Sequence, residues 1–408
     1  MQVHLQLSQI NPKSVIDISG SKSETNRLLL LQALFPEITL DNTSNSDDSE
    51  VMIKALKSKE AVIDIHHAGT AMRFLTAYFA CAKGTQVTLT GSARMKERPI
   101  KILVDALRQL GAQIEYIENE GFPPMKITGK KLTQSKVSLK ANVSSQYISA
   151  LLLIAPKLEK GIEISLEGEI TSIPYIKMTL GLLEEIGVKA ILSGNQITVT
   201  PTPNTQHPIP QKITVESDWS SASYFYSIAA LSPIGTEISL SSYKNNSLQG
   251  DSALVAIYRE FGVTTNFNKN TIVLTKQTQN LTPKTQNLNN TPDIAQTIAV
   301  TCFGLGIACH LTGLHTLKIK ETDRLEALKT ELRKLGANIS VTNDSLTLKP
   351  SENINSNVAI ATYNDHRMAM AFAPLALKVP IVIENAEVVS KSYPDFWNDL
   401  ENIGFIVN

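Results

Sequence analysis

Cationic and hydroxyl side chains gather near the start of this sequence, directly before an apolar run. Residues 20–27 read Gly-Ser-Lys-Ser-Glu-Thr-Asn-Arg, and residues 28–35 are almost entirely apolar. This order predicts the start of a buried helix, where unpaired N–H groups and the positive end of the helix dipole lie. With Lys22 and Arg27 beside it, such a helix end could bind a phosphate or a carboxylate. Taken alone, the same residues are more typical of a serine-capped helix with solvated charges.

The same pattern recurs along the whole chain. Five further polar heads stand before long apolar helices, at residues 69–73, 144–146, 218–223, 292–293 and 365–367. The spacings between successive heads are 48, 75, 75, 73 and 73 residues, counted from Lys22, Thr70, Ser145, Ser220, Asp293 and His366. Regular spacing of this kind indicates an internal repeat, so we expect six copies of one structural unit.

A second type of helix alternates with the first. Five amphipathic helices that end directly before a glycine are predicted at residues 102–110, 178–186, 254–261, 325–335 and 396–403. A glycine just past a helix end favours the left-handed C-cap conformation. Residues 51–56 supply the sixth copy without a glycine, and short strands follow the helices, as at residues 189–192 and 196–200.

These elements predict an α/β (α+β) protein of two domains with three units each. The strands before Gly20 are expected to pair with the last domain, because the first polar-headed helix begins so early in the chain. Residues 275–292 and 350–357 are rich in Asn, Gln, Thr and Pro and are predicted to be surface loops. If the three apolar helices of a domain run inward together, their heads emerge on one face. Two such faces would bound a cation-rich cleft, which suits a substrate with several negative charges.

The composition argues against several classes of function. The 408 residues carry 38 Lys and Arg against 38 Asp and Glu, so we expect no general nucleic-acid or membrane-surface binding. No apolar run reaches the ~20 residues of a membrane helix, and residues 1–5 lack the basic head of a signal peptide, which predicts a cytoplasmic protein. Cys81, Cys302 and Cys309 stand in apolar helical stretches and are expected to be buried free thiols.

Two further charged clusters occupy the same point of the repeat, each just before a glycine-ended helix. They are residues 94–99, Arg-Met-Lys-Glu-Arg-Pro, and residues 318–324, Lys-Ile-Lys-Glu-Thr-Asp-Arg. Either cluster alone would suit a solvated helix start with weak ion pairs. Their shared Lys-Glu-Arg composition at matching positions favours a functional role.

The acid and base candidates are five side chains near these heads and clusters: Asp47, Asp48, Asp293, Glu321 and His366. Cations favour the charged form of a carboxylate, so Asp293 suits a general base. Glu321 suits an acid only where burial or a substrate anion opposes its flanking cations. His366, at a helix start, is more typical of a cap or a hydrogen-bond donor to substrate. No spacing of His and Cys residues indicates a metal site.

Together the motifs resemble those of the EPSP synthase family, the 3-phosphoshikimate 1-carboxyvinyltransferases. The resemblance runs in family order over nearly the whole chain, through residues 20–27, 68–73, 94–99, 144–146, 320–324 and 365–370. It implies transfer of the enolpyruvyl group of phosphoenolpyruvate to the 5-hydroxyl of shikimate 3-phosphate, with release of phosphate and without a metal or an organic cofactor. It also implies a cytoplasmic monomer whose partners are these two small molecules.

The resemblance implies a role for each matching residue. Shikimate 3-phosphate would be held by Lys22, Ser23, Arg27, Ser144, Ser145, Ser172, Asp293 and Lys320. Phosphoenolpyruvate would be held by Lys22, Gly69, Arg94, Gln146, Arg324, Arg367 and Lys391. Asp293 would take the proton of the attacking hydroxyl and Glu321 would protonate the methylene carbon, with assistance from Lys22, Asp47 and His366.

The family architecture implies two domains of three βαβαββ units each, with inward helices and the active site in the cleft between the domains. One domain would be residues 21–216, and the other residues 1–20 with 217–408. The chain departs from the common family pattern at His67, Phe74 and Thr316, and the first two bear on the phosphoenolpyruvate pocket and on inhibition by glyphosate.

Two alternatives stay open. The sister enolpyruvyl transferase that acts on UDP-N-acetylglucosamine shares the fold but typically carries a reactive Cys in the loop that corresponds to residues 91–99, where this chain has none. A non-catalytic anion-binding homologue would be expected to have lost Asp293, Glu321 or the paired arginines, all of which are present.

Overall fold

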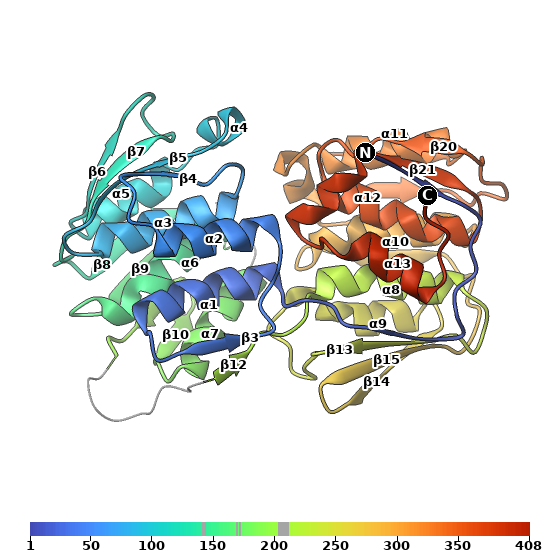
Figure 1. Ribbon diagram of the computed structural model, residues 1–408, viewed down its shortest axis with the longest axis horizontal. Coiled ribbons are helices and arrows are strands. Elements are labelled where there is room, and N and C mark those ends of the chain that lie inside the picture. The colour runs from blue at the N-terminus through green and yellow to red at the C-terminus, as the bar shows by residue number, and fades with distance from the viewer. Residues whose placement is uncertain (141–143, 169, 171–172, 203–211) are drawn as a thin grey trace. The chain divides into compact units, whose positions relative to one another are not determined.

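The computed structural model describes residues 1–140, 144–168, 170, 173–202 and 212–408. Within these ranges the chain forms two compact units. We call residues Ser21–Val215 the inserted unit, and Met1–Gly20 together with Glu216–Asn408 the terminal unit. Each unit contains both helices and sheets (Figure 1), which confirms the predicted α/β class. No helix in the described ranges is long and apolar enough to cross a membrane.

Three apolar helices form the centre of the inserted unit. They are α1 (Lys22–Leu34), α3 (Gly69–Cys81) and α6 (Ser145–Ile154). Helix α6 packs against α3 and α7, and all of its residues from Tyr147 to Ile154 are buried, because a helix that is apolar on all sides must be enclosed. The other helices are α2 (Asp47–Lys57), α4 (Ala93–Lys96), α5 (Lys101–Gln109), α7 (Ile173–Glu185) and the 3-10 helix η1 (Ala155–Lys157).

Two four-stranded sheets with matching topology cover these helices. In the first, the order is β4 (Val62–Asp64), β5 (Gln86–Thr90), β7 (Met125–Thr128) and β6 (Gln113–Tyr116). In the second, it is β8 (Lys136–Lys140), β9 (Ile162–Glu167), β11 (Gln196–Val199) and β10 (Ala190–Ser193). Each sheet has one parallel pair followed by antiparallel pairs. A two-stranded parallel sheet joins β3 (Thr39–Asp41) and β12 (Lys212–Thr214).

The terminal unit repeats this plan. Its apolar helices are α8 (Trp219–Leu231), α10 (Ala295–Gly304) and α12 (His366–Phe372). The apolar run of residues 368–377 predicts one continuous helix, but α12 changes into the 3-10 helix η5 (Ala373–Leu377), because Pro374 has no N–H to donate. The remaining helices are α9 (Leu254–Arg259), α11 (Arg324–Lys334), α13 (Phe396–Ile403), η2 (Gly250–Ala253), η3 (Pro292–Ile294), η4 (His315–Ile319) and η6 (Ala386–Lys391).

Strands from both ends of the chain meet in the sheets of the terminal unit. The first sheet has the order β14 (Val263–Asn268), β15 (Thr271–Lys276), β13 (Glu237–Ser241) and β2 (Lys13–Ile16). The second has the order β16 (Lys284–Asn287), β17 (Cys309–Thr312), β19 (Leu346–Leu348) and β18 (Ile339–Val341). The third has the order β1 (Gln2–Leu5), β21 (Ile381–Glu384) and β20 (Val358–Ile360). The pairing of β1 with β21 and of β2 with β13 confirms the prediction for the first strands.

Several local predictions can be compared with these elements. The five glycines after helices all have positive φ, from 79° to 111°, which confirms the predicted caps at Gly111, Gly187, Gly262, Gly336 and Gly404. The predicted loop 275–292 is wrong in part, because it contains the end of β15 and the whole of β16, a polar strand without apolar alternation. Cys302 and Cys309 are buried free thiols as predicted, whereas Cys81, at the last residue of α3, is only half-buried.

Candidate functional site

The predicted site residues lie at the N-terminal ends of the buried helices in each unit. In the inserted unit, α1, α3 and α6 begin at Lys22, Gly69 and Ser145. The heads of α3 and α6 are joined, because the Gln146 side-chain amide donates to the Thr70 hydroxyl at 3.1 Å. These helix ends place unpaired N–H groups and hydroxyls on the same unit, which is an arrangement that binds anions.

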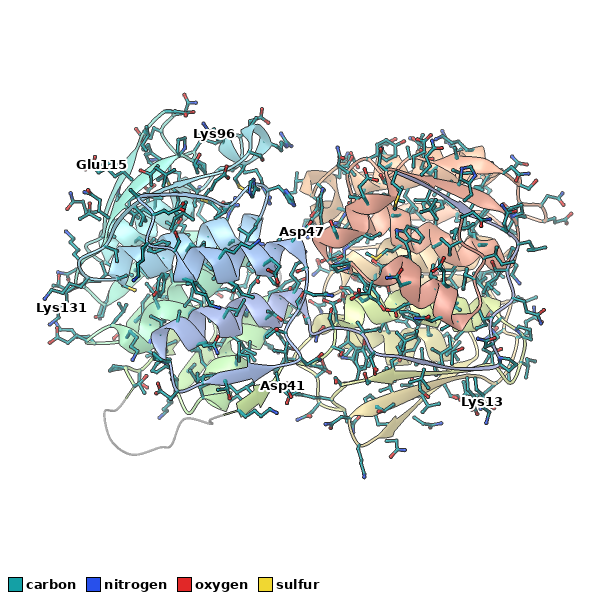
Figure 2. The ribbon with its side chains drawn as sticks, in the orientation of Figure 1. Lys13, Asp41, Asp47, Lys96, Glu115 and Lys131 are labelled. Atoms are coloured by element: carbon teal, nitrogen blue, oxygen red, sulfur yellow. The ribbon has the colours of Figure 1, made fainter. Side chains whose placement is uncertain are left out.

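Lys22 is the cation at the first of these heads. Its Nζ lies 3.9 Å from a carboxylate oxygen of Asp48, and about a quarter of its side chain is exposed. The sequence singled out Asp47 for the role beside Lys22, and Figure 2 shows this residue at the start of α2. The structure also places the buried Asp48 beside the ammonium group, and the role of Asp47 stays a prediction.

Arg27 is buried within the inserted unit and binds mainly neutral groups. Its guanidinium donates to the Thr179 hydroxyl at 2.8 Å, to the Ser23 carbonyl at 2.7 Å and to the Ser149 hydroxyl at 3.2 Å. It also lies 5.5 Å from the ring centre of Phe74. Burial lowers the pKa of Arg27 to about 10. Arg27 therefore connects α1 to α6 and α7 by hydrogen bonds, and it places a buried positive charge in the second turn of α1.

Arg98 lies against the head of α3, a position that the sequence prediction did not assign to it. A Cβ atom added to Gly69 would stand 2.6 Å from Nη1 of Arg98, so the guanidinium rests against the first residue of α3. Arg94, which was predicted instead, lies in the exposed helix α4 and pairs with Glu97 at 2.7 Å. A side chain at position 69 would force the guanidinium to shift, so glycine leaves Arg98 in this place. The structure thus adds Arg98 as a cation at this helix end, and the role of Arg94 stays a prediction.

In the terminal unit, one buried arginine gathers three carboxylates. Arg324, which is 2% exposed, lies 2.9 Å from a carboxylate oxygen of Asp293 and 2.7 Å from one of Glu321. Its Nε also donates to Asp365, which caps the start of α12, at 2.5 Å. Lys320 adds a second cation, 3.4 Å from Asp293. Asp293 itself lies in η3. Lys320, which follows η4, and Arg324, at the start of α11, both approach its carboxylate.

Electrostatics within this cluster hold the guanidinium charged. Burial alone lowers the pKa of Arg324, but the charges of Asp365, then of Glu321 and Asp293, outweigh it, so the pKa rises. A group that stays protonated in this way is a fixed positive charge beside the Asp293 carboxylate. It can bind an anionic ligand or stabilise negative charge that develops during a reaction.

The head of α12 brings the other predicted residues to the same cluster. Arg367 donates to the Asp293 carbonyl at 3.1 Å, and its Nη2 lies 3.6 Å from the Asp293 carboxylate. His366, the first residue of α12, is buried. Lys391 donates to the Asn364 carbonyl at 2.7 Å, just before this helix. Arg367 therefore joins the cluster around Asp293, and Lys391 lies beside the residues that precede α12.

Three further positions that the sequence singled out are Ser144, Ser172 and Thr316. Ser144 caps α6 by accepting a hydrogen bond from the Gln146 amide. Ser172 lies outside the described residues. The hydroxyl of Thr316, where the family pattern differs, is buried in η4 and finds no hydrogen-bond partner among the described residues.

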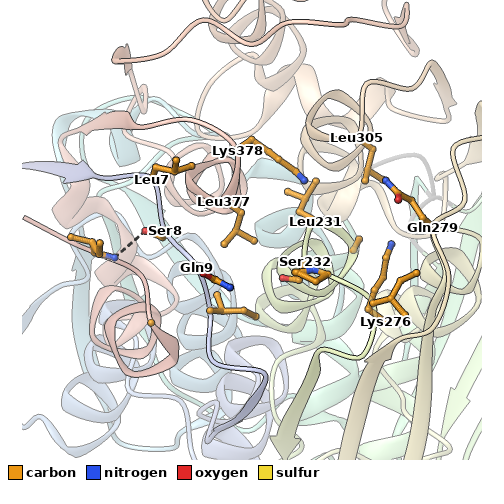
Figure 3. Close-up of a pocket in the computed structure, with 16 residues that line it drawn as sticks. Leu7, Ser8, Gln9, Leu231, Ser232, Lys276, Gln279, Leu305, Leu377 and Lys378 are labelled. Carbon is orange, nitrogen blue, oxygen red and sulfur yellow. Dashed lines mark hydrogen bonds between the residues drawn. The ribbon is translucent and has the colours of Figure 1, made fainter.

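A hollow of about 720 Å³ in the terminal unit lies at the opposite ends of the buried helices (Figure 3). It is lined by residues at the C-terminal ends of α8, α10 and η5, such as Leu231, Leu305 and Leu377. Lys276 also lines it, and burial, together with the nearby charge of Lys378, lowers the pKa of Lys276 to about 8. None of the predicted site residues lines this hollow, so we do not assign the site to it.

Comparisons with known proteins agree with the motifs. A family model described as EPSP synthase (3-phosphoshikimate 1-carboxyvinyltransferase) matches residues 54–400. A relative named 3-phosphoshikimate 1-carboxyvinyltransferase from Bacteroides fragilis (strain YCH46) is 50% identical over 398 residues, which covers 96% of each chain. One of the same name from Shewanella pealeana is 36% identical over 428 residues, covering 98% of this chain and 99% of its own.

Solved structures show the same fold. The chain is similar to an EPSP synthase from Acinetobacter baumannii with a TM-score of 0.81 and 21% identity, covering 100% of this chain and 99% of the other. It is similar to the enolpyruvyl transferase NikO from Streptomyces tendae with a TM-score of 0.74 and 14% identity, covering 100% and 98%. The predicted enolpyruvyl transferase fold is therefore confirmed.

Proposed function

The chain belongs to the EPSP synthase family, and on that premise we propose that it transfers the enolpyruvyl group of phosphoenolpyruvate to the 5-hydroxyl of shikimate 3-phosphate. Membership of this family makes it a transferase of the shikimate pathway. The observation that carries the proposal is the identity of 50% to a curated enzyme over 96% of both chains. The cluster around Asp293 supports it, because a base beside fixed cations suits two anionic substrates.

The proposed reaction proceeds by addition and then elimination. Asp293 takes the proton of the 5-hydroxyl of shikimate 3-phosphate while the oxygen of this hydroxyl forms a bond to C2 of phosphoenolpyruvate. Glu321 gives a proton to the methylene carbon, so that the double bond becomes a single bond. The product is a tetrahedral intermediate. Loss of phosphate then requires removal of a proton from the new methyl group, which the ionised Glu321 can accept. Lys22, Asp47 and His366 assist, and Arg324 holds both carboxylates in place at 2.9 Å and 2.7 Å.

The substrate contacts follow the family motifs, with one change. We propose that shikimate 3-phosphate is held by Lys22, Ser23, Arg27, Ser144, Ser145, Ser172, Asp293 and Lys320. Phosphoenolpyruvate is held by Lys22, Gly69, Arg94, Gln146, Arg324, Arg367 and Lys391, with Arg98 added to this set. The change rests on the contact of Arg98 with Gly69. No metal or organic cofactor takes part in this scheme. We further propose that the protein acts as a cytoplasmic monomer.

The contact of Arg98 with Gly69 can be tested by adding a single methyl group. In the Gly69→Ala variant the new Cβ would start 2.6 Å from Nη1 of Arg98, so the guanidinium must move away. We expect kcat/KM for phosphoenolpyruvate to fall about 10-fold, mainly through KM, because displaced binding groups lose affinity. Initial rates of phosphate release would measure it. The Arg98→Ala variant is the comparison, because it removes the guanidinium without adding a methyl group at position 69. An unchanged KM in Gly69→Ala would remove Arg98 from the site.

The proposed function is tested by phosphate release from phosphoenolpyruvate with two acceptors in parallel. Release with shikimate 3-phosphate and none with UDP-N-acetylglucosamine is expected. Release only with the sugar nucleotide would assign the chain to the sister activity. A folded protein that binds both substrates and releases no phosphate would be a non-catalytic homologue.

A further inference from the structure

Asp251 is a buried carboxylate close to the Asp293 cluster that the reaction scheme does not use. It lies in η2 of the terminal unit and is 9% exposed. The Ser220 hydroxyl, in the first turn of α8, donates a hydrogen bond to it. A carboxylate buried near other acids is costly unless it has a specific partner, so this position needs an explanation.

Ser220 connects Asp251 to an arginine of the proposed site. Nη2 of Arg367 donates to the Ser220 oxygen at 3.2 Å and lies 3.6 Å from the Asp293 carboxylate. Since the Ser220 proton points to Asp251, the hydroxyl turns its lone pairs toward Arg367. The hydrogen bond to an ionised acceptor is also stronger than one between neutral groups. Asp251 therefore sets the orientation of the Ser220 hydroxyl. This hydroxyl is one of the groups that hold the Arg367 guanidinium.

We propose that Asp251 is a positioning residue for phosphoenolpyruvate: through Ser220 it fixes the orientation of the Arg367 guanidinium. The proposal rests on the proposed function for the role of Arg367. Asp251 need not contact substrate, and its effect is expected on KM for phosphoenolpyruvate rather than on kcat.

Protonation of Asp251 gives this arrangement a pH dependence. Burial, followed by the negative charge of Asp293, raises the pKa of Asp251 to about 6, and Asp218 acts in the same direction. The charge of Arg367 and the hydrogen bond from Ser220 act in the opposite direction. Below this pH the neutral carboxyl group is a weaker acceptor, so Ser220 is less firmly oriented. KM for phosphoenolpyruvate should then rise as the pH falls through about 6.

A double-mutant cycle tests the connection. Asp251→Asn and Ser220→Ala should each raise KM for phosphoenolpyruvate about 5-fold, with kcat changed less than 2-fold, in line with the loss of one charge-assisted hydrogen bond. The double variant should resemble Ser220→Ala alone, because Asp251 acts only through this hydroxyl. Ser227→Ala is the control. It removes a buried hydroxyl from the same helix, one that accepts from the Thr301 hydroxyl at 2.8 Å, and its KM should match the wild type.

Two outcomes of the cycle would overturn the proposal. Additive effects of Asp251→Asn and Ser220→Ala would show that Asp251 acts by another route. A lower KM in Asp251→Asn would show that its negative charge repels the substrate directly and that orientation is secondary. The pH profiles separate these effects from titration of the substrate phosphate, because that titration is common to all variants. The rise of KM for phosphoenolpyruvate that is due to protonation of Asp251 should be present in the wild type. It should be absent in Ser220→Ala.

A stability measurement reads the Asp251–Ser220 contact without turnover. An aspartate whose pKa is raised in the folded state stabilises the protein below its unfolded pKa, and this stability is lost as the pH rises through the folded pKa. Relative to Asp251→Asn, the wild type should therefore lose Tm between about pH 4 and pH 6. Ser220→Ala should move this loss to higher pH, because the hydrogen bond that lowers the pKa is gone. If the wild type turned over neither acceptor, the proposed function would fail while this result stood. A Tm difference that does not change with pH would refute the contact itself.

Discussion

Replacing Asp293 with Asn should lower kcat about 10²- to 10⁴-fold, the usual contribution of a positioned general base. The amide has the same shape as the carboxylate but cannot take the proton of the attacking hydroxyl. The cations around it remain, with Lys320 at 3.4 Å and Arg324 at 2.9 Å from the carboxylate position. KM for both anionic substrates should therefore change only a few-fold. Initial rates of phosphate release with shikimate 3-phosphate measure both quantities.

Asp323→Asn is the matched control for this prediction. Asp323 lies near the same cluster and caps α11 by accepting from the Glu326 amide at 3.2 Å. Asparagine caps a helix about as well as aspartate does, so activity and stability should stay close to the wild type. A kcat for Asp293→Asn within a few-fold of the wild type would reject its role as the base.

Replacing Arg324 with Met should destabilise the protein by about 3–5 kcal/mol and abolish activity, because it leaves buried carboxylates without their cation. Asp365 is fully buried and lies 2.5 Å from the Arg324 side chain, and Asp293 lies 2.9 Å from it. The loss should be largest near neutral pH and should shrink in acid, where the abandoned carboxylates can take up protons. Urea unfolding at several pH values would give the free energy of unfolding.

Lys329→Met supplies the comparison from the same helix. Lys329 forms an ion pair with Glu326 at 2.7 Å on the surface of α11, and such pairs contribute less than about 1 kcal/mol. Arg324→Lys tests the geometry separately, because lysine keeps the charge but cannot reach three carboxylates with one planar group. Equal stability of the Met variants at positions 324 and 329 would contradict the view that the buried cluster depends on this guanidinium.

The repeat could be predicted because most of the six repeated segments contain two recognisable helices. One begins with a polar head, and the other ends before a glycine. The polar residues before an apolar run predict the start of α1 at Lys22, and Gly336 predicts the end of α11. Both of these helix ends lie within a residue or two of their predicted places, because each depends only on neighbouring residues. Strand β16 could not be found in this way. Its sequence, Lys-Thr-Gln-Asn, is polar throughout, and it forms a strand because β17 supplies parallel partners for its backbone.

The site could be predicted as a set of charges but not as a set of contacts. The two arginines at 94 and 98 share one cluster, and no local signal shows that Arg98 reaches the head of α3. Asp48 and Asp47 are adjacent, and the position of α2 decides which one faces Lys22. Asp251 stands in no charged motif, and its link to Arg367 joins positions 116 residues apart, 251 and 367. Such contacts form only after the three repeated segments of a domain have packed together.

Pairing of β1 with β21 has a consequence for how the protein is made in the cell. Leu5 pairs with Ile381, which a ribosome adding 5–20 residues per second reaches roughly 20–75 s later. The sheets of the inserted unit draw on strands between Thr39 and Thr214 alone, so this unit can fold while the chain is still growing. During that interval β1 has no partner for its backbone, and its unpaired edge is open to wrong pairing. Folding of the newborn chain can therefore begin with residues 21–215, while residues 2–5, which precede them, are among the last to find their place.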